Sequence, residues 1–284
     1  MKSATHAEAT PGFARLFDLR DTARASERSD GDGTFADQAD RRLIVHPEAD
    51  PVFVEQYRRL GAALHAAQLQ RGIRSVTVAS AVEAEGKTLS ATNLALTLSR
   101  SFRKSVLLVD ADLRKPAVHR LLQLENGVGL SDVLKQPGCP LPTQTLSSTL
   151  SVITSGHPDP DPVGLLASDA ARQFLAETRD RFDWVVVDTP PIVLFPDAGL
   201  IAGRLDTSVM VVSAATTATP VAAKAVAAIG ASRILGIILN RAEPTEIAAG
   251  YGYGQYLDAG SGGRSSRFSR WRAGRRALRQ RNRI

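Results

Sequence analysis

The stretch AVEAEGKT, Ala81 to Thr88, places together a lysine and a hydroxyl residue that suit phosphate binding. Its end, Gly86-Lys87-Thr88, matches the end of the phosphate-binding loop pattern, in which the lysine reaches the β- and γ-phosphates and the hydroxyl binds Mg²⁺. The rest of the stretch is poor in glycine, because Ala81 stands where the full pattern has its first glycine. An ordinary strand–turn–helix with an exposed lysine is therefore the competing interpretation.

Three aspartates follow apolar runs farther along the chain. Asp110 and Asp112 end the run VLLVDAD, and Asp188 ends the run WVVVD. Such runs are typical of strands buried on both faces of a parallel sheet, in which residues two apart point to the same side. Ligands bind at the carboxyl ends of such strands, so we expect the carboxylates to meet the phosphate loop in one crevice. The combination favours a Mg·ATP site.

Hydrophobic patterning predicts the elements that position these residues. Short apolar or β-branched runs predict strands within 75–80, 105–112, 150–156, 183–191, 207–214 and 233–240. Helical patterns fit 168–182 and 219–231, and another helix is expected between Pro51 and a stop at Gly72. The alternation of strand and helix predicts right-handed βαβ units. We therefore expect an α/β fold, a doubly wound, mostly parallel sheet with helices on both faces.

Composition divides the 284-residue chain into three parts. Residues 1–45 are polar and lack a sustained period, which predicts a disordered leader. Residues 46–245 carry the strand–helix alternation and predict a single domain. Residues 246–284 are rich in glycine and arginine, which predicts a flexible tail. Between the first glycines of this tail stand three tyrosines, Tyr251, Tyr253 and Tyr256.

The formal charge of +6 is concentrated at one end of the chain. The segment from Asp258 to Ile284 holds nine arginines and one acidic residue, so the remainder is slightly acidic. Charge confined to a tail does not predict a nucleic-acid-binding face, and we expect no nucleic acid partner. With its spaced Phe268, Trp271 and Leu278, the segment suits a basic amphipathic helix on anionic lipid. A solvated basic tail is the alternative interpretation.

Cysteine usage and apolar segments bear on the compartment. Cys139 is the one cysteine, so no disulfide within the chain is possible, as expected in a reducing cytoplasm. The first residues lack an apolar signal region, and no apolar run reaches membrane-spanning length. We expect a cytoplasmic protein, peripheral at the inner face of the cell membrane.

Longer motifs resemble the bacterial tyrosine kinases of capsular and exopolysaccharide synthesis, within the P-loop ATPases that include the partitioning ATPases. The similarity extends from about Glu55 to Tyr256. It rests above all on EGKTLSATNLA at 85–95, VLLVDADLRKPAVH at 106–119, GLSDVL at 129–134, DPVGLLAS at 161–168, FDWVVVDTPPI at 182–192, DA at 197–198 and RILGIILN at 233–240. Partitioning ATPases carry a lysine early in the loop, and its absence here favours the kinase branch.

This chain departs from the kinase family at two places. The family's loop reads P-G-E-G-K-[ST], whereas Glu83 and Ala84 replace its first two residues here. Alanine restricts the backbone if position 84 requires a positive φ, and Glu83 adds negative charge near the phosphates. The family also uses E-x-x-R-x-x-R for subunit contact, and Gly61 replaces the second arginine. We expect nucleotide affinity and self-association to be the properties affected.

The resemblance implies ATP and Mg²⁺ as cofactors and assigns roles to residues of this chain. Catalysis would involve Lys87, Asp110, Asp112 and Asp188. The nucleotide would be bound by Glu85, Gly86, Lys87, Thr88, Leu89 and Arg114. The metal would be held by Thr88, Asp110, Asp112 and Asp188. The phosphate acceptors would be Tyr251, Tyr253 and Tyr256 of a neighbouring subunit.

The resemblance also implies partners, and rival functions stay open. A homo-oligomer is expected, together with a transmembrane polysaccharide co-polymerase, the chain-length protein, as a separate activator. One rival is a P-loop ATPase that positions cargo and phosphorylates nothing. Another is a nucleotide-sensing regulator of polysaccharide assembly whose altered loop binds ATP without turnover. Phosphotyrosine on the purified protein discriminates among them.

Overall fold

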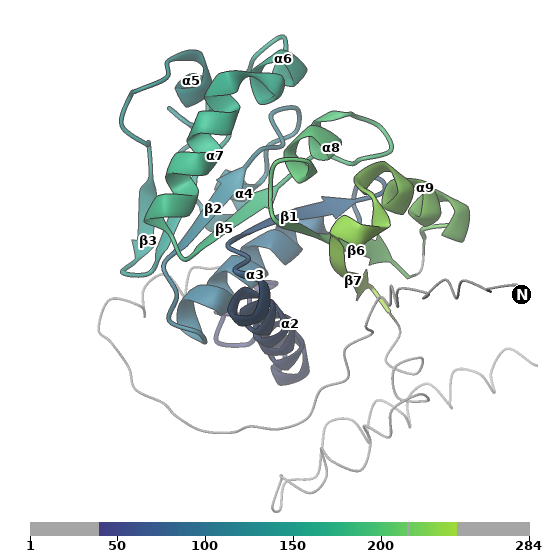
Figure 1. Ribbon diagram of the computed structural model, residues 1–284. Helices are drawn as coiled ribbons and strands as arrows, with labels where there is room; N and C mark the ends of the chain where they lie inside the picture. Colours follow the sequence, from purple (N-terminus) through teal and green to yellow (C-terminus); the bar gives the residue numbers. More distant parts are fainter. Residues whose placement is uncertain (1–39, 215, 243–284) are drawn as a thin grey trace, which may run out of the picture. The chain divides into compact units, whose positions relative to one another are not determined.

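A computed structural model describes residues 40–214 and 216–242 (Figure 1). Its centre is a seven-stranded sheet with the order β3-β4-β2-β5-β1-β6-β7. All neighbouring strands are parallel except β3 and β4. The strands are β1 Ser75–Ser80, β2 Val106–Asp110, β3 Gln144–Ser147, β4 Leu150–Ile153, β5 Trp184–Asp188, β6 Thr207–Ser213 and β7 Ile234–Asn240. The predicted α/β fold with a mostly parallel sheet is confirmed.

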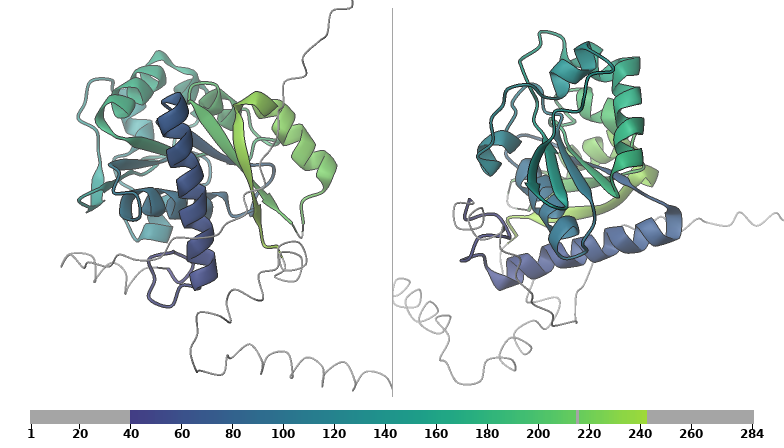
Figure 2. Two further views of the ribbon diagram at one scale, coloured as in Figure 1. Left: turned by 60° about the horizontal axis from the view of Figure 1, so that its bottom comes forward. Right: turned by 90° about the vertical axis from the view of Figure 1, so that its left-hand side faces the viewer.

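Helices cover both faces of this sheet (Figures 1 and 2). One face packs against α2 Pro51–Arg71, α3 Lys87–Arg100 and α4 Val118–Leu122. The opposite face packs against α5 Leu130–Lys135, α6 Pro162–Ala167, α7 Asp169–Arg181, α8 Asp197–Ala202 and α9 Thr219–Ile229. A short 3-10 helix, Ala231–Arg233, precedes β7. The two-sided cover explains why the central strands are apolar along their whole length.

Side-chain alternation divides the core into two layers. In β1, Val76 and Val78 pack among the helices α2 to α4, whereas Ala79 faces the side of α8 and α9. In β5, Trp184 and Val186 lie in the first layer, and their odd-numbered neighbours lie in the second. All these side chains are buried. The strand ends are thus fixed from both sides, which a precise site at the sheet's edge requires.

Helix α2 begins and ends as its sequence predicts. The Asp50 carboxylate accepts a hydrogen bond from the Val52 N–H at 2.8 Å, and Pro51 occupies the first turn. Gly72 ends the helix with a φ of 67°. Within α2, a Cβ on Gly61 would lie 2.6 Å from the Phe102 ring. Glycine at 61, where the family has arginine, therefore serves close packing against the end of α3.

The folded domain begins before the predicted boundary at residue 46. Leu43 and Val45 are buried and belong to the core cluster beneath α3. The Asn93 side chain accepts from the Ile44 N–H at 2.9 Å and donates to the Arg42 carbonyl at 3.1 Å. The assignment of residues 40–45 to a disordered leader was wrong, because the three consecutive apolar residues at 43–45 form too short a run to give a periodic signal.

The antiparallel strand β3 was not predicted. Its sequence, QTLS, has four residues, and none of them is fully buried. Such a short edge strand is specified by pairing with β4 rather than by its own pattern. The predicted tyrosine cluster and arginine segment lie outside the described residues. Within the described part, no helix is long and apolar enough to cross a membrane.

Candidate active site

The phosphate loop joins the end of β1 to the start of α3. Its last residue, Gly86, has a φ of 92°, and a Cβ there would clash with the Asn240 amide nitrogen. That nitrogen donates to the Glu85 carbonyl at 2.8 Å. Glycine is thus required at 86 for both conformation and space. Ala84 has a φ of 62°, so the alanine that replaces the family's glycine adopts the left-handed conformation, at a cost of about 1–2 kcal/mol.

The first turn of α3 presents backbone donors to this loop. Gly86 caps the helix without a side-chain hydrogen bond, and the first intrahelical bond is donated by the Ser90 N–H to the Gly86 carbonyl. The N–H groups of Lys87, Thr88 and Leu89 precede that bond and point out of the helix end. Together with the dipole of this 14-residue helix, they favour an anion at this position.

Lys87 lies between two carboxylates from neighbouring strand ends. Its Nζ is 3.2 Å from Asp112 Oδ2 and 3.3 Å from Asp188 Oδ1. The Lys87 side chain is only 9% exposed, and both carboxylates are buried. The structure therefore brings together the lysine of the loop after β1 and the aspartates that follow β2 and end β5. This convergence is the one expected at the carboxyl ends of parallel strands.

Asp110 faces this cluster but is engaged by the backbone. Its Oδ2 accepts hydrogen bonds from the N–H groups of Ala117 and Val118, each at 3.0 Å. Its Oδ1 accepts from the Asp112 N–H at 3.2 Å. Since β2 ends at Asp110, Asp112 lies in the following loop, and strand alternation was the wrong reason for grouping the two. A backbone turn anchored on Asp110 brings Asp112 to Lys87 instead.

Burial and mutual repulsion shift the pKa values of this cluster. Burial, with a further contribution from the Asp188 charge, raises the pKa of Asp110 to about 7. Burial also raises the pKa of Asp188, against the opposing charge of Lys87. Burial alone would lower the pKa of Lys87, but Asp188 and Asp112 outweigh it and the pKa is raised. Lys87 therefore stays positively charged, whereas burial and mutual repulsion oppose the ionisation of Asp110 and Asp188.

Arg114, in the same loop as Asp112, is held by an ion pair. Its Nε donates to Asp197 Oδ2 at 2.7 Å, and the fully buried Asp197 begins α8. The guanidinium also lies over the Phe195 ring, 4.4 Å from its centroid. Next to it, the Lys115 N–H donates to Asp112 Oδ1 at 3.0 Å. The ion pair thus joins the loop after β2 to the segment after β5.

Glu85 is a buried residue of the loop, with its side chain directed into the protein. One carboxylate oxygen accepts from the Val82 N–H at 2.8 Å. The other accepts from the Ser213 N–H at 3.1 Å and from the Thr217 hydroxyl. The carboxylate therefore ties the phosphate loop to the end of β6. Because the side chain is engaged in this way, the backbone of Glu85 is the part left for the predicted contact with nucleotide.

One buried oxygen in the cluster suits a metal-bound water. No described residue donates a hydrogen bond to Asp188 Oδ2, although this atom is buried. Thr88 stands at the helix start beside it, with its Oγ1 3.4 Å from Lys87 Nζ. Within 40–214 and 216–242, no group of three or more His, Cys, Asp or Glu residues is placed to hold a metal alone. Mg²⁺ in nucleotide sites takes one or two protein ligands with phosphate and water, so the residues fit.

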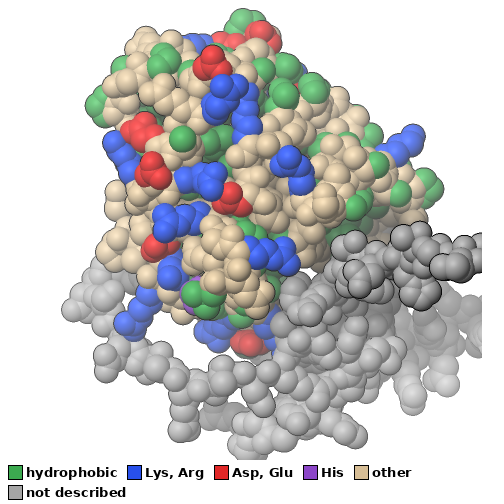
Figure 3. Space-filling model, in the orientation of Figure 1, with side chains coloured by type: hydrophobic (Ala, Val, Ile, Leu, Met, Phe, Trp, Pro, Cys, Tyr) green, Lys and Arg blue, Asp and Glu red, His purple; other side chains and the backbone are tan. Residues whose placement is uncertain are grey.

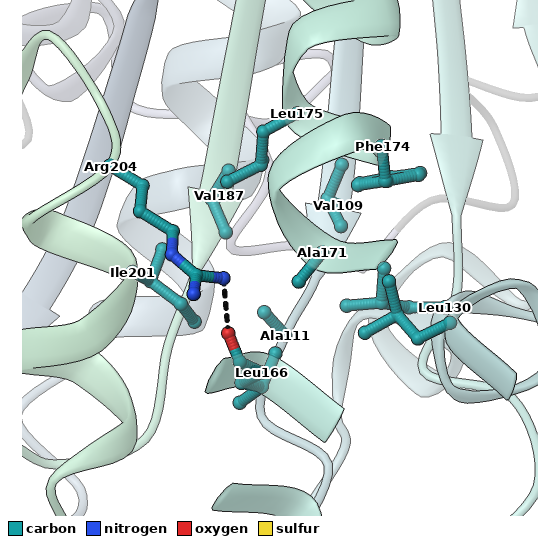
Figure 4. Close-up of a pocket in the computed structure, with 11 residues that line it drawn as sticks. Val109, Ala111, Leu130, Leu166, Ala171, Phe174, Leu175, Val187, Ile201 and Arg204 are labelled. Carbon is teal, nitrogen blue, oxygen red and sulfur yellow. Dashed lines mark hydrogen bonds between the residues drawn. The ribbon is translucent and has the colours of Figure 1, made fainter. Parts of the chain in front are cut away.

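A small cavity lies elsewhere, in the core layer of α5 to α8 (Figure 4). Its volume is about 20 Å³, room for roughly one water. Apolar side chains line it, and Arg204 crosses its edge to donate to the Leu166 carbonyl. It cannot hold a nucleotide.

The surface seen in Figure 3 carries interspersed charges of both signs on the side away from α9, and α9 itself has Lys224 as its one charged residue.

Comparison with known proteins identifies the class to which this fold and site belong. A family model described as ParA, NUBPL iron-transfer P-loop NTPase, matches residues 73–249. The tyrosine-protein kinase YwqD of Bacillus subtilis strain 168 is 39% identical over 204 residues, which cover 70% of this chain and 86% of the relative. The chain is therefore a P-loop NTPase of the ParA type.

Solved structures narrow this class. The kinase domain of the Escherichia coli tyrosine kinase ETK superposes with a TM-score of 0.61 at 30% identity, covering 67% of this chain and 77% of that one. The chimerical protein CapA2B2 superposes with a TM-score of 0.65 at 28% identity, covering 71% and 90%. The chain belongs to the bacterial tyrosine-protein kinase family, and its enzyme class is ATP-dependent protein-tyrosine kinase. The resemblance stated from the motifs is confirmed.

Two residues that shape the site were not among the predicted ones. Asn240 supports the Glu85 carbonyl, and Asp197 holds Arg114. Both stand at the edges of motifs that carried the resemblance, RILGIILN and DA. A search for polar residues closing apolar motifs would have selected Asn240, but its partner across 155 positions is visible only in the fold.

Proposed function

We propose that this protein transfers the γ-phosphate of ATP to tyrosines of its own tail and regulates polysaccharide polymerisation and export. The observation that carries the proposal is the position of Lys87. It lies at the start of α3 and between Asp112 and Asp188. A cation at a helix N-terminus, next to carboxylates at strand ends, is the arrangement that in-line phosphoryl transfer requires.

In this scheme each residue has one role. Lys87 leaves its carboxylate partners to bind the β- and γ-phosphates, while the N–H groups of the first turn of α3 bind phosphate oxygens. Asp112 Oδ2, the oxygen facing Lys87, accepts the proton of the attacking tyrosine hydroxyl. Both carboxylate oxygens of Asp110 accept hydrogen bonds from backbone N–H groups, so Asp110 positions Asp112 rather than contacting substrate. Glu85 holds the loop in shape.

Magnesium would be held by the loop and by β5. Thr88 Oγ1 suits the direct protein ligand, and Asp188 Oδ2 suits a water in the ion's shell, since it lacks a donor among the described residues. When bound, Mg²⁺ neutralises charge on the phosphates. The raised pKa of Asp188 reflects burial, and a nearby cation would favour its ionised form.

The acceptors in this proposal are Tyr251, Tyr253 and Tyr256 of a neighbouring copy, which makes the protein a homo-oligomer. Interleaved glycines leave the segment GYGYGQY free to extend into a site. Each phosphate adds about −1.5 to −2 charge beside the arginine segment, which would loosen the assembly or refold the tail.

The remaining parts of the proposal concern location and activation. The arginine-rich segment from Asp258 to Ile284 would bind anionic lipid at the inner face of the membrane. A transmembrane co-polymerase would complete the site through its cytoplasmic end. The solved relative CapA2B2 is itself a chimera, as its name states, which fits a kinase that works joined to a second polypeptide.

Autophosphorylation tests the proposal directly. Purified full-length protein is incubated with Mg·ATP, alone and with the cytoplasmic segment of the proposed co-polymerase, and phosphotyrosine is detected by immunoblot and peptide mass spectrometry. The wild type should carry phosphate on the tail tyrosines, and Lys87→Met should carry none. A variant with all three tail tyrosines changed to phenylalanine is the matched control for acceptor identity. Phosphotyrosine unchanged in Lys87→Met would contradict the assignment of the site.

A further inference from the structure

The charged residue that breaks the family's loop pattern has a partner in this fold. Glu83 replaces the family's proline in the phosphate loop. Lys115, in the loop after β2, places its Nζ 2.8 Å from Glu83 Oε1 and 2.9 Å from Oε2. The ammonium group thus contacts both carboxylate oxygens. The side chains are 70% exposed for Lys115 and 45% exposed for Glu83.

This ion pair joins the two loops that form the candidate site. Glu83 lies four residues before Lys87, and Lys115 lies three residues after Asp112. The backbone N–H of Lys115 donates to Asp112 Oδ1, and the other oxygen of Asp112 contacts Lys87 Nζ. Lys115 is therefore linked to the site through its backbone and to the phosphate loop through its side chain.

Electrostatics explain why the chain requires such a pair. A glutamate in a phosphate-binding loop repels the triphosphate, unless a cation offsets its charge nearby. The neighbouring cations are committed elsewhere, since Lys87 contacts Asp112 and Asp188, and Arg114 contacts Asp197. Lys115 is the cation that contacts Glu83 among the described residues.

We propose that Lys115 is a positioning residue for nucleotide, which forms with Glu83 an ionic clasp across the mouth of the phosphate site. The clasp cancels the charge of Glu83 beside the bound phosphates. The inference rests on the proposed function, because it assumes that the loop binds ATP. It assigns Lys115 no contact with phosphate, so its effect depends entirely on Glu83.

A double-mutant cycle on ATP binding tests this dependence. Dissociation constants for Mg·ATP are measured by calorimetry on the full-length wild type, Glu83→Gln, Lys115→Gln and the double variant, near 50 mM and 500 mM salt. Lys115→Gln should weaken binding about fivefold at low salt, the scale of an exposed charge interaction. The double variant should recover wild-type affinity within about twofold, and high salt should reduce the Lys115→Gln effect.

Lys135→Gln is the matched control. Lys135 ends α5 and pairs with Asp159 at 2.7 Å, so its loss removes the same charge from an ion pair outside the two loops. It should leave ATP affinity unchanged. Circular dichroism and thermal melting on every variant separate binding effects from folding.

The outcomes distinguish the clasp from the function on which it rests. If Lys115→Gln weakens binding equally with and without Glu83→Gln, Lys115 acts on the nucleotide itself and the clasp is refuted. No effect of Lys115→Gln in a protein that binds ATP also refutes it. Absence of ATP binding in the folded wild type would contradict the proposed function, and it would refute the role of the clasp as well.

Discussion

The substitution Glu85→Gln tests whether a buried carboxylate shapes the phosphate loop. The Glu85 side chain is 1% exposed and accepts hydrogen bonds from the Val82 N–H, the Ser213 N–H and the Thr217 hydroxyl. Glutamine keeps the size of the side chain but has one acceptor oxygen instead of two. At least one of the three donors therefore loses its acceptor and meets the amide NH₂ group instead.

The magnitude follows from the cost of a buried donor without an acceptor. One such donor costs about 1–3 kcal/mol, and loss of the charge weakens the remaining hydrogen bonds. A total of about 2–3 kcal/mol corresponds to a fall in Tm of about 4–12 °C for a domain of this size. Because the loop would lose its tie to β6, ATP affinity should also fall, by about tenfold or more.

Thermal melting and calorimetry with Mg·ATP on the purified variant measure both effects. Glu83→Gln is the control, since it makes the same chemical change two residues away on a half-exposed side chain. It should shift Tm by no more than about 2 °C. Equal shifts for the two variants would refute the anchoring role of Glu85. A lower Tm with unchanged ATP affinity would show that the anchored loop shape is not needed for binding.

Three other substitutions test separate parts of the account. Gly86→Ala should weaken ATP binding at least about tenfold, because the left-handed backbone and the Asn240 amide both oppose a Cβ; an unchanged Kd would show that the loop adapts. For Asp110→Asn, the Tm deficit relative to wild type should shrink between about pH 5 and pH 8. Burial raises the pKa of Asp110 to about 7, so in the folded wild type this carboxyl is neutral at the lower pH and its contribution to stability is lost as the pH rises through that value. A deficit that stays constant between about pH 5 and pH 8 in paired melting curves would show that the backbone donors keep Asp110 ionised. Gly61→Arg, which restores the family residue, should lower Tm by about 2–6 °C because a Cβ at 61 meets the Phe102 ring. An unchanged Tm, together with a larger assembly in sedimentation, would contradict the packing role of Gly61.

Local signals sufficed to predict much of this fold from sequence. The run SVTVAS became β1 with the expected bounds, and α2 begins at Pro51 and ends before Gly72. Strands of this kind are apolar along their whole length, and the helix has a cap and a stop that act within a few residues. Lys87 and Asp188 could be assigned to one edge of the sheet because parallel strands end there together.

The rest depended on contacts between distant segments. Glu85 matched a family motif, yet its partner Ser213 lies 128 residues away, and nothing in the sequence shows that its carboxylate points inward. The Glu83–Lys115 pair is likewise a product of folding. Leu43 and Val45 belong to a three-residue apolar run in a polar segment, and only the fold shows that α3 provides a surface for them. Such side-chain roles are set by tertiary neighbours, which local patterns do not encode.

Autophosphorylation is tested most directly by intact-mass spectrometry of the full-length protein, incubated with Mg·ATP alone and with the cytoplasmic segment of the proposed transmembrane chain-length protein. Added phosphates should map to Tyr251, Tyr253 and Tyr256 in the wild type and should be absent in Lys87→Met. No added phosphate under either condition, in a protein that calorimetry shows to bind ATP, would contradict the autokinase and favour a nucleotide-sensing regulator.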